Sequence, residues 1–257
     1  MKIIKSCAVA VFAAVASGGA HAAEAEKASV SWVFNDIVAP AEQAAYEAAI
    51  KSFNKCLGQH GSKFGWIAYT HETGDTYKYS YVAGNLSWAD IDTMRATTKD
   101  CQSTWRNEGN AHLKSETSNF LVVQPELSRM PNVKDGQPAL LNVTYFTLKG
   151  TYGSDDAFTD GLKKITAGAE KTKWNGHYIV YKVRAGDKGA PDYILVSPYK
   201  NFAEYGAGFN PPVWKMLEAA NGKADADAVR KQINDAIEDV SSHVNGYSAE
   251  LTYTPAK

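Results

Sequence analysis

The sequence lacks the features that several classes of protein require. Its 257 residues carry 27 Lys and Arg against 28 Asp and Glu, so it has no excess positive charge for a nucleic-acid surface. After the first twenty-odd residues, no apolar run approaches the ~18 residues that span a bilayer. It has three cysteines and no CxxC, HExxH, GxSxG, Walker or Rossmann pattern. We therefore expect no nucleic-acid partner and no membrane span, and no motif predicts a metal site or names a reaction.

Residues 1–22 are typical of a signal peptide. Lys2 and Lys5 precede an apolar stretch from Cys7 to Ala16, and Ala20-His21-Ala22 is an A-x-A cleavage pattern. A buried N-terminal helix is the alternative, but the apolar stretch offers no polar face for one. Cleavage leaves 25 basic and 28 acidic residues. The remaining chain of about 235 residues is long enough for one large core or two small ones. We expect a periplasmic or secreted protein.

The chain contains an internal repeat. Residues 66–69 (WIAY), followed by Gly74-Asp75, align with residues 178–181 (YIVY), followed by Gly186-Asp187, at an offset of 112. Further on, residues 88–90 (WAD) match residues 202–204 (FAE) at an offset of 114. The two extra residues fall in a Gly- and Pro-containing turn, where hairpins tolerate insertions. Matches in register, interrupted only at a turn, indicate duplication.

Each half also predicts the same order of elements, from the spacing of apolar residues and the positions of turns and caps. In the first half, we expect strand 29–38, a helix from Pro40, strands 64–71 and 77–83, a helix from about Asp90, and strand 120–124. In the second half, we expect strand 140–148, a helix from Ser154, strands 177–184 and 193–197, helices 213–220 and 225–243, and strand 249–254. Residues 130–138, with two prolines and a glycine, are the expected linker.

Strand-helix-strand-strand-helix-strand is the ferredoxin-like order. Two such units in one chain resemble the dimeric α+β barrel superfamily in its fused, single-chain form. The expected fold is therefore α+β, with tandem ferredoxin-like units at residues 23–131 and 132–257. The resemblance implies two sheets that face each other with helices on the outside. Members include cofactor-free monooxygenases, haem enzymes and small-ligand binders, so the fold leaves the function open.

Export would leave two cysteines, Cys56 and Cys101. An even number of cysteines in an oxidising compartment favours a disulfide. In the ferredoxin-like fold the two helices of the first unit lie side by side, and both cysteines fall on the buried sides of these helices. We therefore predict a Cys56–Cys101 disulfide, with two separate buried thiols as the alternative.

Tyr77, Tyr79 and Tyr81 alternate along one expected strand, so their rings should point to one face of the sheet. If the preceding turn is a three-residue loop, Tyr69 and His71 share this face. Tyrosine rings and hydroxyls suit an aromatic ligand. Ordinary sheet packing is the alternative, because tyrosine is a good strand former.

The loop of residues 205–212 combines glycines with Tyr205 and Phe209 and has no counterpart in the first half. It is predicted either to close over a pocket as a lid or to pack its aromatic side chains into the core. His243, expected on the last helix, is either a ligand or a solvated histidine.

These features favour an exported small-ligand-binding or accessory protein with an aromatic-lined pocket for a small apolar or aromatic molecule. The alternative is an oxidoreductase of the barrel class, either a cofactor-free monooxygenase or a haem enzyme. No cofactor is predicted, and haem is the second possibility. The candidate ligand-binding residues are Tyr69, His71, Tyr77, Tyr79, Tyr81, Tyr205 and Phe209.

Overall fold

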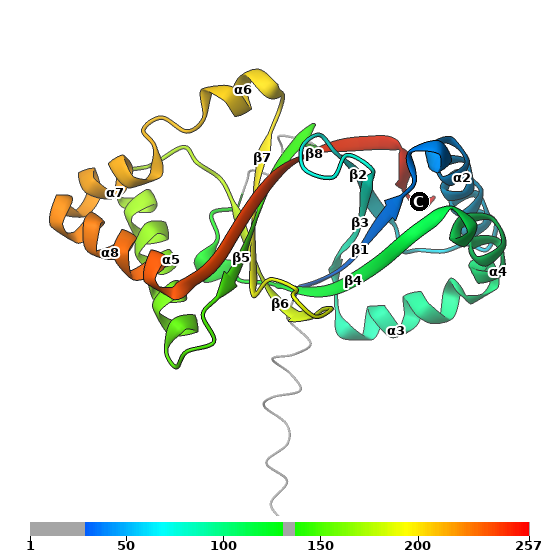
Figure 1. Ribbon diagram of the computed structural model, residues 1–257, viewed down its shortest axis with the longest axis horizontal. Helices are drawn as coiled ribbons and strands as arrows, with labels where there is room; N and C mark the ends of the chain where they lie inside the picture. The colour runs from blue at the N-terminus through cyan, green and yellow to red at the C-terminus, as the bar shows by residue number, and fades with distance from the viewer. Residues whose placement is uncertain (1–28, 131–136, 257) are drawn as a thin grey trace, which may run out of the picture.

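A computed structural model of the chain describes residues 29–130 and 137–256. Eight strands form one closed, antiparallel barrel, and helices cover this barrel on two opposite sides (Figure 1). The fold is therefore α+β, as expected. The predicted signal peptide, residues 1–22, and the predicted boundary between residues 131 and 132 lie outside the described residues. No helix within the described ranges is both long enough and apolar enough to cross a membrane.

The first half follows the predicted order of elements. Its strands are β1 (Val30–Val38), β2 (Trp66–His71), β3 (Lys78–Leu86) and β4 (Leu113–Val123). Its helices are α2 (Gln43–Gln59), α3 (Trp88–Thr97) and α4 (Gln102–Thr104), with the short turns η1 (Pro40–Glu42), η2 (Lys99–Cys101), η3 (Trp105–Gly109), η4 (Asn110–His112) and η5 (Pro125–Leu127). The last strand begins earlier than the expected residue 120.

The second half repeats this order with more helix. Its strands are β5 (Leu140–Leu148), β6 (Ile179–Ala185), β7 (Tyr193–Tyr199) and β8 (Ile237–Tyr253). Its helices are α5 (Ser154–Lys171), α6 (Phe202–Ala207), α7 (Val213–Asn221) and α8 (Lys223–Ala236). In Figure 1, α5, α7 and α8 lie on one side of the barrel, and α2, α3 and α4 lie on the other.

The expected helix 225–243 is wrong in its second part. The helix α8 ends at Ala236, and the chain continues as the 17-residue strand β8. This strand pairs with β5 over its first part and with β2 over its second. Pairing with two strands outweighs the helix-like spacing of Val240 and Val244. His243 therefore lies on a strand.

The strand order around the barrel is β1-β3-β2-β8-β5-β7-β6-β4. Each half contributes four adjacent strands, β4-β1-β3-β2 in the first half and β8-β5-β7-β6 in the second, so the order is the same in both. The halves are joined at two seams, where β2 pairs with β8 and β4 pairs with β6. Ile67 pairs with Val82 in the first hairpin, and Ile179 pairs with Val196 in the second. These pairs reproduce the offsets of 112 and 114, so the predicted equivalence of the two hairpins is confirmed.

The helices α2 and α5 pack against their sheets through matching apolar stripes. Tyr46 and Ile50 on α2 are buried, as are Phe158 and Leu162, which occupy positions 112 residues further on. A stripe of this period places one helix face on the core. The second half adds α7 and α8 to this layer, and its buried residues on this side form one continuous core cluster.

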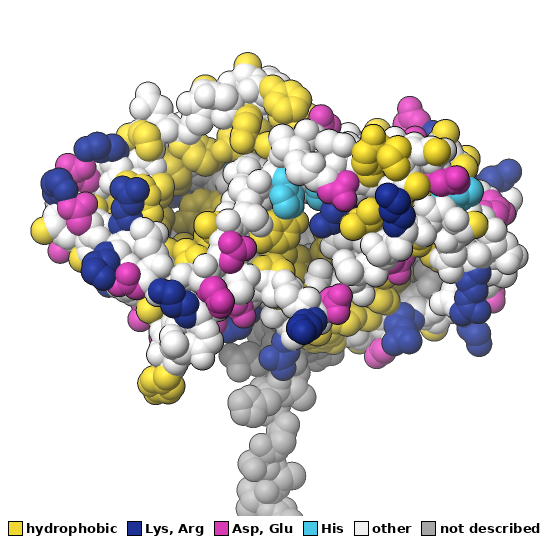
Figure 2. Space-filling model, viewed as in Figure 1, with side chains coloured by type: hydrophobic (Ala, Val, Ile, Leu, Met, Phe, Trp, Pro, Cys, Tyr) yellow, Lys and Arg dark blue, Asp and Glu magenta, His cyan; other side chains and the backbone are white. Residues whose placement is uncertain are grey.

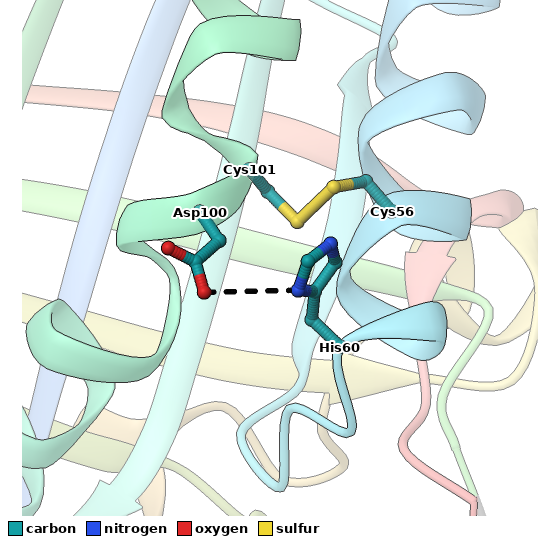
Figure 3. Close-up of a disulfide and its surroundings, with 4 residues drawn as sticks. All are labelled: Cys56, His60, Asp100 and Cys101. Atoms are coloured by element: carbon teal, nitrogen blue, oxygen red, sulfur yellow. Dashed lines mark ion pairs between the residues drawn. A yellow bond between two sulfur atoms is a disulfide. The ribbon is translucent and has the colours of Figure 1, made fainter.

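The predicted disulfide is present. Cys56, near the end of α2, is bonded to Cys101, directly before α4, with an S–S distance of 2.08 Å and a Cα–Cα distance of 5.8 Å. Figure 3 shows His60 beside the bridge, with its Nδ1 3.7 Å from Oδ2 of Asp100. The bridge fixes the irregular segment after α3 against α2.

Candidate functional site

A cavity of about 400 Å³, here called the outer cavity, lies between the first-half sheet and the helices that cover it. Successive strand side chains point to opposite faces. The even-numbered residues of β1 therefore face the helices, while Asn35 faces the barrel interior. Aromatic rings form much of the wall: Trp32, Phe34, Phe53, Trp66, Tyr81 and Trp105. Such a wall suits a planar, apolar molecule.

Asp36 is the polar group at the base of this wall. It is only 2% exposed, and the Tyr46 hydroxyl donates a hydrogen bond to its Oδ2 at 2.6 Å. The same hydroxyl lies 2.9 Å from that of Tyr81. The other oxygen, Asp36 Oδ1, has no partner among the described residues, although the side chain lines the cavity. A buried acceptor without a donor is costly, so this oxygen is suited to receive a proton or a hydrogen bond, either from the facing Glu116 carboxyl or from a bound molecule.

A second carboxyl, that of Glu116 on β4, lies directly across from Asp36. Burial raises the pKa of Asp36 to about 7, the hydrogen bond from Tyr46 opposes this rise, and the nearby Glu116 adds to it. Burial also raises the pKa of Glu116. Because two adjacent carboxyls resist joint ionisation, the pair retains a proton readily. Asp36 is thus able to exchange a proton near neutral pH.

The mouth of the outer cavity carries positive charge. Arg95 on α3 and Arg106 in η3 are exposed and line the cavity. Positive charge at the mouth of a cleft attracts anions and stabilises negative charge that develops within it. The arginines and the buried carboxyl give this cavity the parts needed for proton transfer.

The equivalent region of the second half is apolar and filled. Asp36 pairs with Tyr79 across β1 and β3, and the corresponding pair across β5 and β7 is Phe146 with Tyr193. The ring of Phe146 lies 5.1 Å from that of Phe158, and both belong to the large core. Among the described residues, the Asp36–Glu116 pair therefore has no carboxyl counterpart at the position of Phe146 in the second half.

A second cavity, of about 450 Å³, lies inside the barrel and is called the interior cavity here. Strands from both halves line it. An adjoining space of about 340 Å³ shares Asn35, Asn119 and Tyr145 with it and is also lined by Lys78 and His243. The interior and outer cavities lie on opposite faces of the first-half sheet.

The structure separates the predicted tyrosine face into two. Tyr69 pairs with Ser80, so Tyr69 and His71 face the barrel interior, whereas Tyr79 and Tyr81 face the helices. The expectation that they share one face is wrong. The connection between β2 and β3 is longer than the three-residue loop that the expectation assumed. The pairing of β3 with β2 is therefore shifted by an odd number of residues, which places Tyr79 and Tyr81 on the face opposite to that of Tyr69.

His71 belongs to a hydrogen-bonded chain inside the barrel. Its Nε2 lies 2.9 Å from Ser80 Oγ, and the Ser80 hydroxyl donates to Asn35 Oδ1 at 2.7 Å. Burial, together with the charges of Lys78 and His243, lowers the pKa of His71 to about 3. The rings of the two histidines lie 5.3 Å apart. His243 therefore faces the barrel interior.

The remaining predicted residues lie elsewhere. Tyr77 precedes β3 and is 38% exposed. Tyr205 and Phe209 pack on Tyr199, with ring centroids 5.3 and 5.7 Å from it. Neither lines the outer cavity, the interior cavity or its adjoining space, and the same holds for the rest of loop 205–212. Their role in ligand binding stays a prediction.

Sequence reasoning missed Asp36 and Glu116. One feature of the sequence could have indicated the site. Asp36 is an acid on the same strand face as the aromatic residues Trp32 and Phe34, and the equivalent position of the second half holds the apolar Phe146. A buried acid that replaces an apolar repeat position indicates a specialised site.

Comparison with known proteins identifies the fold. No family model and no curated protein matches the sequence. A proposed monooxygenase from Lactobacillus acidophilus NCFM has a TM-score of 0.53 at 7% identity, over 89% of this chain and 97% of that chain. An anthrone oxidase-like protein has a TM-score of 0.54 at 15% identity, over 87% and 93%. The chlorite dismutase of Candidatus Nitrospira defluvii has a TM-score of 0.53 at 10% identity, over 86% and 92%.

The chain has the dimeric α+β barrel fold. At these identities the likeness extends to the fold alone.

Haem, one cofactor found with this barrel fold, does not fit the residues of the outer cavity. Haem iron takes an axial histidine, cysteine, methionine or tyrosine ligand. No histidine or cysteine is among the described residues that line the outer cavity. The hydroxyl of Tyr81 is buried against Tyr46, and Met94 packs into the core. His71 and His243 lie inside the barrel, on the other face of the sheet.

Proposed function

We propose that this barrel protein is an oxidoreductase that oxidises an aromatic substrate in the outer cavity without a bound cofactor. The observation that carries the proposal is the buried carboxyl of Asp36, whose unpartnered oxygen belongs to a cavity walled by aromatic rings. Its pKa of about 7 suits a general base at neutral pH. The rings hold a planar substrate by stacking.

The reaction that we propose uses molecular oxygen as the oxidant. Asp36 removes a proton from an acidic CH₂ group of the substrate, and the resulting carbanion is delocalised over the aromatic rings. Electron transfer to O₂ and formation of a C–O bond give a peroxide, which takes the proton back from Asp36. Loss of the second C–H proton with hydroxide then leaves a carbonyl group. Overall, the CH₂ group and O₂ are converted to a carbonyl group and water. Arg95 and Arg106 stabilise the anionic intermediates.

The structural neighbours support this proposal over ligand binding without chemistry. They include a proposed monooxygenase and an anthrone oxidase-like protein. A binding protein would have no need for a buried carboxyl such as that of Asp36, because burying such a group costs stability.

We also propose that the two halves are tandem ferredoxin-like units and that the mature protein is exported. The shared strand order and the equivalent hairpins support the first of these proposals. The signal-like residues 1–22 and the Cys56–Cys101 disulfide support the second, since disulfides persist in oxidising compartments.

Anthrone, a polycyclic ketone with an acidic CH₂ group, tests the proposed function. Oxygen uptake and anthraquinone absorbance are followed for the wild type and for Asp36→Asn. The asparagine still accepts the hydrogen bond from Tyr46 but cannot take a proton, so we expect kcat to fall by about 10²–10⁴. Asp155→Asn is the matched control, because Asp155 accepts a hydrogen bond from the Tyr193 hydroxyl in the second half.

Two results would contradict the proposal. Equal rates in the wild type and in Asp36→Asn, with anthrone still bound, would favour a ligand-binding protein. A Soret band in the purified protein would show that haem is bound and would remove the cofactor-free mechanism.

A further inference from the structure

We propose that the interior cavity is a second binding site, for an uncharged, largely apolar molecule that carries a hydroxyl group. This site is separate from the outer cavity and does not depend on the proposed oxidation. Its volume of about 450 Å³ is within the range of small-molecule sites. Near the centre of the face shown in Figure 2, the surface is hollowed between the two helical sides, with hydrophobic side chains inside the hollow.

The lining excludes a charged ligand. No Asp, Glu, Lys, Arg or His is among the described residues that line the interior cavity. A charged group that entered it would lose its hydration without gaining a partner of opposite charge, which is unfavourable. An apolar body is favoured instead by the aliphatic side chains of Val33, Val82, Leu121, Val143, Ile194 and Val196.

The polar groups of the lining call for a hydroxyl. Asn245 is 4% exposed, and its Oδ1 has no hydrogen-bond partner within the described parts of the chain. A buried amide oxygen of this kind is stabilised by a donor on a ligand. Tyr145 and Tyr181 line the same cavity, and burial is the cause that raises the pKa of each. Both stay neutral at physiological pH and can donate to the hydroxyl oxygen of the ligand.

The interior and outer cavities can be occupied independently. On β1, Asn35 faces the interior cavity, while Asp36 faces the outer one. Trp66 is the residue that lines both. A substitution on one face of the sheet can therefore remove one site while the substituted side chain does not touch the other site.

Three probes with the same ring system test the proposal by calorimetric titration. 2-Naphthol is uncharged and has a hydroxyl, naphthalene lacks the hydroxyl, and 2-naphthoate carries a negative charge. All are measured with Gln102→Trp, in which a new ring at the outer cavity blocks that site. We expect one 2-naphthol molecule to bind per chain, and 2-naphthoate to bind at least about tenfold more weakly because its charge is desolvated.

Substitutions inside the barrel locate the site. Asn245→Leu keeps the side-chain size but removes the acceptor, so 2-naphthol should bind about fivefold to tenfold more weakly while naphthalene binding is unchanged. Val143→Trp should fill the cavity and abolish binding of both probes. Val196→Phe narrows the same space and serves if Val143→Trp does not fold.

Several outcomes would overturn the proposal. The first is the absence of 2-naphthol binding to Gln102→Trp, which would mean that the cavity holds water alone. The second is equal affinity for 2-naphthol and 2-naphthoate, which would contradict the ligand class. The third is unchanged binding in a folded Val143→Trp or Val196→Phe protein, which would place the probe elsewhere.

Discussion

Asp36 occupies a position whose counterpart in the second half is Phe146, which is half-buried and packs against the core. Asp36 and Asn245 each leave one buried oxygen without a partner among the described residues. Each therefore lowers the stability of the fold, and each lines a cavity where a ligand can supply the missing donor. At the scale of single residues, the two sites are visible as polar atoms that the fold does not satisfy.

The raised pKa of Asp36 predicts a pH dependence of stability. Its pKa is about 7 in the folded protein against an ordinary value of 3.8, so between these values the folded state binds more protons than the unfolded state. Stability from this group is therefore lost as the pH rises from 3.8 to about 7, by at most about 1.4 kcal/mol per pH unit. Urea unfolding should show this loss for the wild type relative to Asp36→Asn. Parallel curves for the two proteins would contradict the prediction.

His71 predicts a dependence of the opposite sign. Its pKa is lowered from 6.5 to about 3 by burial, with Lys78 and His243 adding to the effect, so the unfolded state binds more protons over this range. Stability should fall as the pH decreases from 6.5 towards 3. In His71→Gln, which can still hydrogen-bond Ser80, this part of the acid sensitivity should be absent from unfolding curves. NMR titration that places the His71 pKa near 6.5 would refute the prediction.

At the scale of elements, the first half is held together less by helix packing than the second. Its segment after α3 is broken into short turns, and the disulfide attaches this segment to α2. The second half instead packs α5 closely against α7 and α8. The gap left in the first half is the outer cavity.

Removing the disulfide should destabilise the first half. The Cys56–Cys101 bridge closes a loop with a sequence separation of 45 residues. The chain-entropy model gives about 4 kcal/mol for a loop of this size. We expect the double variant Cys56→Ala, Cys101→Ala to lose stability of this order in urea unfolding. An unchanged unfolding midpoint, or two reactive thiols in the unreduced wild type, would contradict this.

The contact between α5 and α8 depends on a glycine. A Cβ at Gly161 would lie 2.3 Å from Ile233 Cγ1, so Gly161→Ala should cost about 1–3 kcal/mol despite the better helix propensity of alanine. Gly58 on α2 has no neighbour within 4 Å of such a Cβ. Gly58→Ala is therefore the matched control and should leave the thermal midpoint unchanged or slightly higher. Equal effects of the two substitutions would refute the packing argument.

At the scale of the whole molecule, the barrel makes the two halves one structure. Backbone hydrogen bonds cross both seams, and β8 of the second half pairs with β2 of the first. The interior cavity has walls from both halves, whereas the outer cavity belongs to the first half. A chain with two similarly ordered halves can thus keep one half as support and specialise the other.

The seams predict that the halves unfold together. Phe158→Ala opens the core of the second half, at a cost of about 3–5 kcal/mol. Because the seams couple the halves, we expect amide exchange to accelerate in β1 and β3 as well as in β5 and β7. Faster exchange confined to the second half would show that the halves unfold separately.

Local periodicity and turn residues were enough to predict the internal repeat, most of the order of elements and the equivalence of the two hairpins. The disulfide followed from the cysteine count together with the barrel fold. The long strand β8 was not visible locally, since the spacing of Val240 and Val244 is helical and only pairing with β2 and β5 makes this segment extended.

Tertiary structure also decided which face each tyrosine occupies, because a shift of an odd number of residues in the register exchanges the faces of a strand. Burial of Asp36 beside Tyr46 and Glu116 arises from the packing of α2 on the sheet and the pairing of β1 with β4. Asp36 is a candidate catalytic base because it is buried and has a second carboxyl nearby. Neither property is recorded in the local sequence pattern.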